Sequence, residues 1–287
     1  MSRLAYVNGR FLRQGDAGVS IEDRGYQLGD GIYEVWAVID GKLADAEGHF
    51  VRLKRSLGEL QIDMPMSREA LTVALRETVR RNRVRYGIVY LQVTRGVARR
   101  DHAFPTVPVA PTVVITARSI DRDGAEAKAA KGVSVITLPD NRWGRCDIKT
   151  INLLPNVLAK QAAKEEGGFE ALLVDADGLV TEGASSNAWI VDREGVLRTR
   201  DTGANILRGV TRLSIIDVAR QAGYKVEERP FTVAEAKAAR EVFVTGAGAL
   251  VMPVVRIDDS PVGNGHPGEV ASALRAAYIE HVTQTAV

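Results

Sequence analysis

The sequence predicts two α+β domains, on the basis of its length and of a mixed pattern in each half. At 287 residues the chain has room for roughly two domains of about 150 residues each. Short strand-like segments separated by turns come first and helical periodicities follow, and strands and helices mix again in the second half. We expect an N-terminal α+β domain over residues 1–118, an interdomain linker over 119–131 and a C-terminal α+β domain over 132–287.

The first strands are predicted from the turns that separate them. Asn8-Gly9 and Asp40-Gly41 are dipeptides that supply the positive φ of tight hairpins, and Gly15-Asp16 marks a third turn. The strands expected around these turns are Leu4–Val7, Phe11–Arg13 and Gly31–Ile39.

Two helices and two more strands complete the N-terminal half. One helix is indicated by apolar residues three or four positions apart, namely Phe50, Leu53, Leu57 and Leu60. A second helix is indicated in the same way by Leu71, Leu75 and Val79, with Ser67 as its N-cap. The segments Tyr86–Thr94 and Thr112–Ala117 are rich in Val, Ile and Tyr, which favours strands.

The expected linker lies in the charged, Ala-rich stretch between Arg118 and Gly132, where apolar periodicity is weak. Beyond it we expect four strands, Val133–Leu138, Phe169–Val174, Ala188–Val191 and Glu241–Val244. We also expect four helices, at about Leu154–Glu166, Val210–Ala222, Val233–Arg240 and Val270–Val282.

Composition excludes several classes of protein. Lys and Arg number 38 against 36 Asp and Glu, and this net charge of +2 lacks the basic excess of a nucleic-acid-binding protein. No run approaches the ~18 apolar residues of a membrane span. The single cysteine cannot form an intramolecular disulfide, and the first residues have neither a secretory nor a transit pattern. We therefore expect a cytoplasmic protein without nucleic-acid or membrane partners.

Two kinds of site are disfavoured by spacing. The four histidines share no metal-ligand spacing with one another or with Cys146, so no metal site is expected (His49, His102, His266 and His281). Cys146 has Arg145 beside it, but the sequence places no histidine near it, which favours a small packing residue over a nucleophile.

Two other segments suggest binding of an anion. The small residues Gly246-Ala247-Gly248 follow a strand as in a dinucleotide-binding fingerprint, but Val251 replaces the third glycine and Pro253 stands where a helix should continue. We reject the dinucleotide fold there, which leaves a backbone anion site or a plain turn. The amides of Val210 and Thr211 begin a predicted helix and can bind an anion, although every helix start has such donors.

Lys149 and Glu182 together suggest a pyridoxal phosphate site. Lys149 lies between two isoleucines at the end of an extended run, and an inward-facing lysine loses its charge more readily, as a Schiff-base lysine must. A strand lysine facing solvent is the alternative. Glu182 stands among small polar residues and is either a turn carboxylate or the acid that partners a pyridinium nitrogen.

Five ordered motifs resemble the signature series of the class IV (fold-type IV) aminotransferases. They are YQLGDGIYEV, HFVRLKRS, DIKTINLLPNVLAKQ, TEGASSN and ILRGVTR, and the similarity extends over nearly the whole chain. The resemblance implies a two-domain α+β fold with pyridoxal 5′-phosphate in the interdomain cleft. It also implies a homodimer whose active sites share residues across the interface.

The resemblance assigns roles to individual residues. Lys149, in the C-terminal domain, would hold the cofactor and move the substrate proton, and Glu182 would keep the pyridine nitrogen protonated. Arg52 and the amides of Val210 and Thr211 would bind the phosphate. Taken alone, Arg52 could equally be a solvated charge, because it lies off the apolar stripe of its helix.

Two further positions affect how tightly the cofactor binds. Leu207 would pack on the pyridine ring. Family members carry hydroxyl residues where this chain has Gly246, Ala247 and Gly248, so that Ala247 would contribute no side-chain donor to the phosphate. Loss of such a hydrogen bond weakens binding by about 1.5–3 kcal/mol, and we therefore expect the cofactor to be released more readily than in relatives.

The segment Thr94–Pro105 resembles the carboxylate trap of D-amino acid aminotransferases. Arg100 and His102, with Tyr33, would bind the substrate carboxylate, since a guanidinium, an imidazole and a phenol can fill its lone pairs. Arg100 is preferred to Arg99 for its two-residue step to His102, and the family implies that both reach in from the partner subunit. Without the resemblance, a solvated polar loop is the simpler interpretation.

The predicted function is transamination of D-amino acids by a ping-pong mechanism. The expected pair is D-alanine with 2-oxoglutarate, giving pyruvate and D-glutamate. The alternatives are a branched-chain L-amino acid aminotransferase, for which the apolar Trp36 can be cited, an R-amine aminotransferase, and a protein like the lyase that acts on aminodeoxychorismate.

Overall fold

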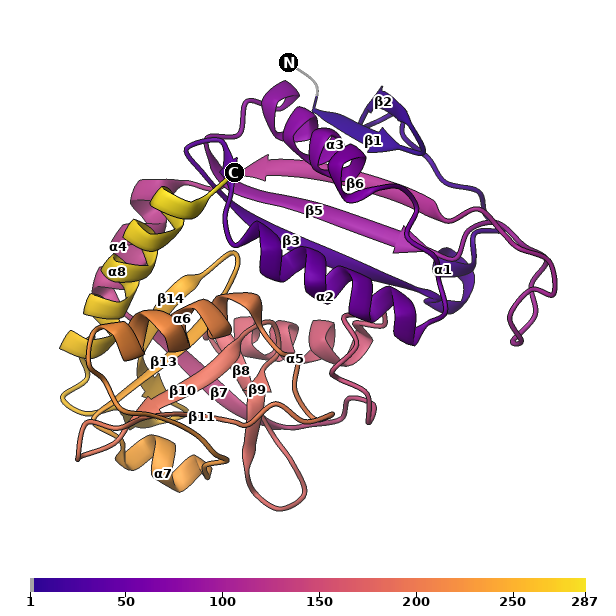
Figure 1. Cartoon of the computed structure of the whole chain (residues 1–287). Coiled ribbons are helices and arrows are strands. Elements are labelled where there is room, and N and C mark those ends of the chain that lie inside the picture. Colours follow the sequence, from indigo (N-terminus) through magenta and orange to yellow (C-terminus); the bar gives the residue numbers. More distant parts are fainter. Residues whose placement is uncertain (1–2) are drawn as a thin grey trace. The chain divides into compact units, whose positions relative to one another are not determined.

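The computed structural model describes residues 3–287, which form two compact units (Figure 1). The first unit comprises residues 3–121, 148–152 and 285–287, and the second comprises Arg122–Asp147 and Leu153–Gln284. Each unit contains helices and a β-sheet, which confirms the α+β fold class.

The first unit is built on a six-stranded sheet. Its order is β2-β1-β6-β5-β3-β4, and neighbouring strands pair antiparallel. Asn8 and Gly9 both have positive φ in the turn between β1 and β2, and Asp40 and Gly41 have the same conformation between β3 and β4, as their sequences predict. The strands are β1 (Leu4–Val7), β2 (Arg10–Arg13), β3 (Gly31–Ile39), β4 (Lys42–Leu43), β5 (Tyr86–Thr94) and β6 (Thr112–Ser119).

Two helices cover one face of this sheet, α2 (Ala46–Glu59) and α3 (Arg68–Arg81) (Figure 1). The predicted apolar stripes are buried in the core beneath them. The hydroxyl of Ser67 accepts a hydrogen bond from the amide of Ala70, which makes it the N-cap of α3. A one-turn helix, α1 (Arg24–Leu28), precedes β3 and was not predicted.

The second unit is built on a nine-stranded sheet. The path is β12-β11-β10-β13-β14-β7-β8-β9, and β15 pairs with β14. The predicted strands appear as β7 (Val133–Pro139), β8 (Glu170–Val174), β10 (Asn187–Val191) and β13 (Glu241–Gly246). The sequence did not predict β9 (Val180–Gly183), β11 (Leu197–Thr199), β12 (Val226–Glu228), β14 (Leu250–Ile257) or β15 (Ser260–Pro261).

Four helices of the second unit fall close to their expected positions. They are α5 (Leu154–Glu165), α6 (Val210–Gln221), α7 (Val233–Ala238) and α8 (Glu269–Thr285). Among residues 3–287 no helix combines the length and the hydropathy that a membrane crossing requires.

Two details differ from the expected domain plan. Most of the expected linker is a helix, α4 (Arg122–Lys131), that belongs to the second unit. Its alanines favour helix and Ala129 is buried, while Glu126 accepts hydrogen bonds from the guanidinium of Arg275 on α8. Residues 148–152 group with the first unit, although we expected Lys149 in the C-terminal domain. They do so because their backbone pairs with β3.

Candidate active site

The segment that carries Lys149 runs alongside the start of β3. The amide of Tyr33 donates to the carbonyl of Lys149 at 3.0 Å, and the amide of Ile151 donates to the carbonyl of Gly31 at 3.2 Å. The amide of Lys149 lies 3.3 Å from the hydroxyl of the buried Ser56 on α2. Because its own backbone is fixed in this way, Lys149 has little freedom except along its side chain.

The amine of Lys149 lies over an aromatic ring. Its Nζ is 4.1 Å from the ring centroid of Tyr33, and that ring stacks on Tyr90 with centroids 5.6 Å apart. No hydrogen bond or ion pair among residues 3–287 involves this amine. The lysine is half-buried, so it is not the fully solvated strand lysine that was the alternative. Two of the residues assigned from the family motifs, Lys149 and Tyr33, therefore lie together in the first unit.

Arg52 is held by a buried carboxylate rather than by solvent. Its Nε and Nη2 donate to the two oxygens of Glu34 at 2.7 and 2.8 Å. His49, one turn earlier on α2, places Nδ1 2.7 Å from the same carboxylate. The side chain of Arg52 is only 10% exposed and that of Glu34 is fully buried. A bidentate pair of this kind fixes the plane of the guanidinium.

The charges in this cluster follow from burial and pairing. Burial alone would raise the pKa of Glu34, but the charge and hydrogen bonds of Arg52, helped by His49, lower it far below its usual range. Burial lowers the pKa of His49 more than Glu34 raises it. At neutral pH we therefore assign an ionised Glu34 and a neutral His49 that donates through Nδ1.

Arg100 and His102 lie on the connection between β5 and β6. Both side chains are exposed, and neither takes part in a hydrogen bond or ion pair among residues 3–287. Arg99 is exposed as well. Exposure is what a solvated loop would show, and it is also what a side chain donated to a partner subunit would show in a single chain.

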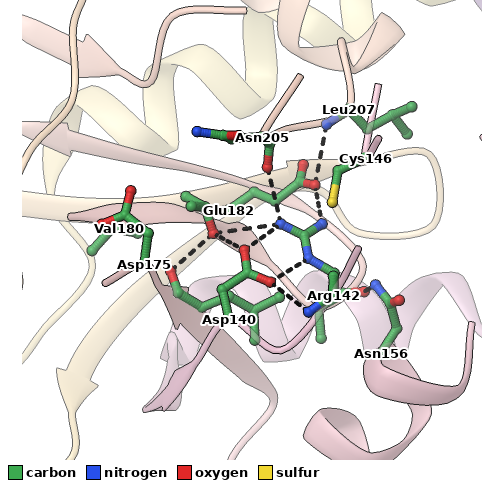
Figure 2. Close-up of polar contacts among 12 residues, drawn as sticks. Asp140, Arg142, Cys146, Asn156, Asp175, Val180, Glu182, Asn205 and Leu207 are labelled. Carbon is green, nitrogen blue, oxygen red and sulfur yellow. Dashed lines mark hydrogen bonds and ion pairs between the residues drawn. The ribbon is translucent and has the colours of Figure 1, made fainter. Parts of the chain in front are cut away.

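In the second unit, a group of polar residues surrounds Glu182, which lies near the end of β9 (Figure 2). Its carboxylate accepts from Arg142 Nη1, from Asn187 Nδ2 at 2.9 Å and from the amide of Leu207 at 3.1 Å. Glu182 is 4% exposed. It is therefore no ordinary turn carboxylate, since three donors aim at it inside the fold.

Arg142 links Glu182 to a second carboxylate. Its Nε and Nη2 donate to Asp140 at 2.9 and 2.7 Å, and Nη2 also lies 3.2 Å from the carbonyl of Asn205 (Figure 2). Burial alone would lower the pKa of Arg142, but the two carboxylates raise it above its usual value. The pKa of Asp140 is lowered, because its bonds from Arg142 and Thr181 outweigh burial. This permanently charged guanidinium stabilises the negative charge of Glu182.

Asn187 ties Glu182 to the loop before α6. Its side-chain amide donates to Glu182 and, at 3.0 Å, to the carbonyl of Leu207. Gly209 follows in close contact, because a Cβ there would lie 1.9 Å from Asn187 Oδ1. Only glycine fits, so one asparagine fixes both the acid and the entry to the helix.

Val210 and Thr211, which we expect to bind an anion, stand at the start of α6. Gly209 is the N-cap and supplies no side-chain hydrogen bond to the first turn, in which Val210 and Thr211 lie. Residues 246–257 form the turn and second strand of a β-hairpin, with Gly246 opposite Leu250. A strand and not a helix follows the small residues, which confirms that the dinucleotide fold was rightly rejected. Ala247 lies half-buried in this turn.

Cys146 behaves as a packing residue. Its thiol is buried, lies 3.1 Å from the carbonyl of Trp143, and has its pKa raised to about 11 by burial. A thiol with this pKa is protonated at neutral pH and is a poor nucleophile. Residues 3–287 contain no group of three or more His, Cys, Asp or Glu side chains arranged to hold a metal ion.

Sequence reasoning gave no role to Glu34, Asp140, Arg142 or Asn187. Glu34 and Asn187 stand inside quoted motifs, so an unexplained acid or amide there was a usable signal. Arg142 lies three residues before Arg145, which we considered only as a neighbour of Cys146. Its partner Glu182 is 40 residues away, and nothing in the local sequence pairs them.

The family model for amino-transferase class IV matches residues 31–257 of the chain. The chain belongs to the class IV aminotransferases. It is therefore a pyridoxal-phosphate-dependent aminotransferase, as the motifs implied, with the fold of that family.

Named relatives cover almost the whole chain. It is 42% identical to the D-alanine aminotransferase of Bacillus licheniformis over 97% of this chain and 98% of that one. It is 41% identical to the D-alanine aminotransferase of Staphylococcus epidermidis strain RP62A, over 96% and 97%. Among solved structures, the T.th. branched-chain amino acid aminotransferase with pyridoxamine 5′-phosphate superposes with a TM-score of 0.88 at 30% identity, covering 99% of this chain and 95% of that one.

The residues present suit this cofactor. The aldehyde requires an amine, and the amine of Lys149 has no polar partner among residues 3–287. The ring nitrogen requires an acid, and Glu182 is a buried carboxylate oriented by a guanidinium. The phosphate requires amide donors, and α6 begins without a side-chain cap.

Proposed function

We propose that this aminotransferase acts on D-amino acids, with D-alanine and 2-oxoglutarate as its substrate pair and pyruvate and D-glutamate as its products. The relatives named D-alanine aminotransferase, at 41–42% identity over nearly the whole chain, carry the proposal. The branched-chain structure is less similar, at 30% identity. The Arg100-x-His102 spacing, which resembles a carboxylate trap, adds support from this chain itself.

The residues that the family motifs assign to the cofactor make up its proposed site. Pyridoxal phosphate, when bound, carries the amino group between the two half-reactions of a ping-pong cycle and accepts the charge left when the α-proton departs. Lys149 would hold its aldehyde, Glu182 its ring nitrogen and Arg52 its phosphate, while Leu207 would cover one ring face. The phosphate would also receive the amides of Val210 and Thr211, next to Ala247.

In the proposed mechanism Lys149 moves the substrate proton. Its free amine would take the proton from the substrate α-carbon as a general base and then give a proton back as a general acid. Glu182 would keep a proton on the ring nitrogen, and the guanidinium of Arg142 would stabilise the charged form of Glu182 for that task. Tyr33, Arg100 and His102 orient the substrate by its carboxylate, which decides the hand of the amino acid that is accepted.

We also propose a homodimer in the cytoplasm. The exposed Arg100 and His102 would each serve the site of the partner subunit. A single cysteine that is buried and protonated suits a reducing compartment.

A substrate panel tests the function. Purified, cofactor-loaded protein is given D-alanine, L-leucine or R-1-phenylethylamine with 2-oxoglutarate, or aminodeoxychorismate with no acceptor. We expect D-alanine to be converted fastest, with D-glutamate as product. Faster conversion of L-leucine would favour the branched-chain alternative, faster conversion of the amine an R-amine aminotransferase, and turnover without an acceptor a lyase.

Arg100→Ala tests the carboxylate site. The loss of a charge-assisted hydrogen bond should lower kcat/KM for D-alanine at least tenfold and leave R-1-phenylethylamine, which has no carboxylate, little changed. Arg99→Ala is the matched control and should be nearly neutral. Equal losses for both substrates would argue against a carboxylate role for Arg100.

A further inference from the structure

The connection that carries Arg100 and His102 is tied to the segment before α1. We name residues 97–105 the trap loop. At its base the amide of Arg24 donates to the carbonyl of Gly96 at 2.9 Å, and the amide of Ala98 donates to that of Glu22 at 3.3 Å. Asp23 and Val97 form an antiparallel bridge between these two bonds. These backbone contacts therefore fix the base of the trap loop.

Beneath the loop lies a buried cluster of three charged residues. Asp30 accepts from Arg24 Nε at 2.7 Å and from Arg95 Nε and Nη2 at 2.7 and 3.0 Å. The side chains of these three residues are at most 9% exposed. Arg95 also donates to the carbonyls of Leu60 and Gln61, at 2.6 and 3.2 Å.

Both arginines reach from this cluster to the trap loop. Arg24 Nη1 donates to the carbonyl of Asp101 at 2.7 Å, and Asp101 stands between Arg100 and His102. The guanidinium of Arg95 lies 3.7 Å from the ring centroid of Phe104. The loop is thus held at Asp101, between Arg100 and His102, and again at Phe104, two residues beyond His102.

We propose that Arg24, Asp30 and Arg95 are positioning residues that hold the trap loop so that Arg100 and His102 are ordered before a substrate carboxylate arrives. The inference rests on the proposed function of those two residues. Two guanidiniums around one carboxylate leave a buried positive charge, which costs more than apolar packing of the same volume. A loop already ordered avoids the entropy cost that a mobile loop would add to substrate binding.

Arg24→Lys removes the tether with the least disturbance. The lysine keeps the positive charge beside Asp30 but lacks the planar fork that reaches Asp30 and Asp101 together. We expect the KM for D-alanine to rise about tenfold with kcat within twofold of wild type. Amide hydrogen exchange over residues 97–105 should become faster. Arg85→Lys, at an exposed position of the same unit, should change neither.

A double-mutant cycle with Arg100→Ala separates positioning from plain stability. If Arg24 acts through the trap loop, Arg24→Lys lowers kcat/KM for D-alanine about tenfold in the wild-type background. The loss is several-fold smaller when Arg100 is already alanine, because only His102 is then left to position. An equal loss in both backgrounds overturns the inference. It is also overturned if Arg24→Lys causes no loss while Arg100→Ala lowers kcat/KM. No effect of Arg100→Ala itself overturns the carboxylate role of Arg100, which identifies a failure of the proposed function.

Phe104→Leu tests the other attachment if Arg24→Lys does not fold. Phe104 is 48% exposed, so this change removes the contact with Arg95 without burying an unpaired charge. The same cycle with Arg100→Ala should again show a smaller loss than in the wild-type background. Additive losses would contradict the inference.

Discussion

In the first unit a buried carboxylate holds an arginine, whereas in the second unit a buried arginine holds a carboxylate. Glu34 fixes Arg52, the proposed phosphate ligand, and Arg142 fixes Glu182, the proposed partner of the ring nitrogen. In both cases the residue that a motif assigns to the cofactor is half of a buried pair. The pair sets the charge and the orientation of that side chain before the cofactor binds, so cofactor binding does not have to order the side chain.

Lys149 is the exception to this pattern, and its replacement should have the largest effect. Its amine lies over the Tyr33 ring and makes no hydrogen bond or ion pair among residues 3–287. Lys149→Ala should abolish turnover and the chromophore that borohydride reduces, because no other amine would hold the aldehyde. Lys164→Ala, at an exposed position on α5, is the control and should keep both. Full activity of Lys149→Ala would refute the assignment.

Arg142→Met should have the next largest effect, on stability. It leaves Asp140 and Glu182 buried without their shared cation, and breaking a buried pair costs about 3–5 kcal/mol of unfolding free energy. Arg52→Met strands only Glu34 and should cost less. Urea unfolding of both variants, with the exposed Arg145→Met as control, measures the difference. A larger loss for Arg52→Met would contradict the expectation that stability depends on how many buried carboxylates lose their cation.

The sequence predicts the fold well where an element is periodic and meets one face of a sheet. Gly31–Ile39 and Tyr86–Thr94 are strands with the bounds expected of them, and α2 and α3 bury the stripes that identify them. Val180–Gly183 is short and fully buried, so it shows no alternation. Arg122–Lys131 lacks an apolar stripe because alanine dominates it, and its helix depends on propensity.

The site divides in the same way. The residues that would touch the cofactor are found from motifs, because a chemical role fixes both residue type and spacing. Their partners are not found, since Glu34 and Arg52 are 18 positions apart and Arg142 and Glu182 are 40 apart. Only the pairing of strands and the packing of helices bring them together. A buried acid or arginine within a motif is therefore the signal to look for.

Ala247→Thr should have a smaller effect, on retention of the cofactor. If the hairpin turn lies at the phosphate, a hydroxyl there adds a hydrogen bond to a charged group, about 1.5–3 kcal/mol. The variant should release pyridoxal phosphate at least tenfold more slowly than wild type during dialysis, followed by absorbance. Ala247→Val has the same shape without the hydroxyl and should not. Full retention of the cofactor by wild type at nanomolar concentration would contradict the expectation of a loose site.

The pH dependence of stability near neutrality should show the smallest effect, and His49 in the Glu34 cluster contributes to it. The pKa of His49 is lowered below its ordinary 6.5, mainly by burial, so the unfolded chain binds a proton near pH 6 that the folded chain does not. Stability from this group is present above pH 6.5 and is lost as the pH falls, by at most about 1.4 kcal/mol per pH unit.

His49→Gln isolates this term, because a glutamine amide can still donate to Glu34 but does not titrate. Between pH 7.5 and 5.5 the unfolding free energy of wild type should fall more steeply than that of the variant. His266→Gln, at an exposed position, should follow the wild-type curve. Parallel curves for wild type and His49→Gln would mean that His49 binds its proton as readily in the folded protein as in the unfolded chain. The first unit would then hold Arg52 with an ion triad, and its contrast with the second unit would disappear.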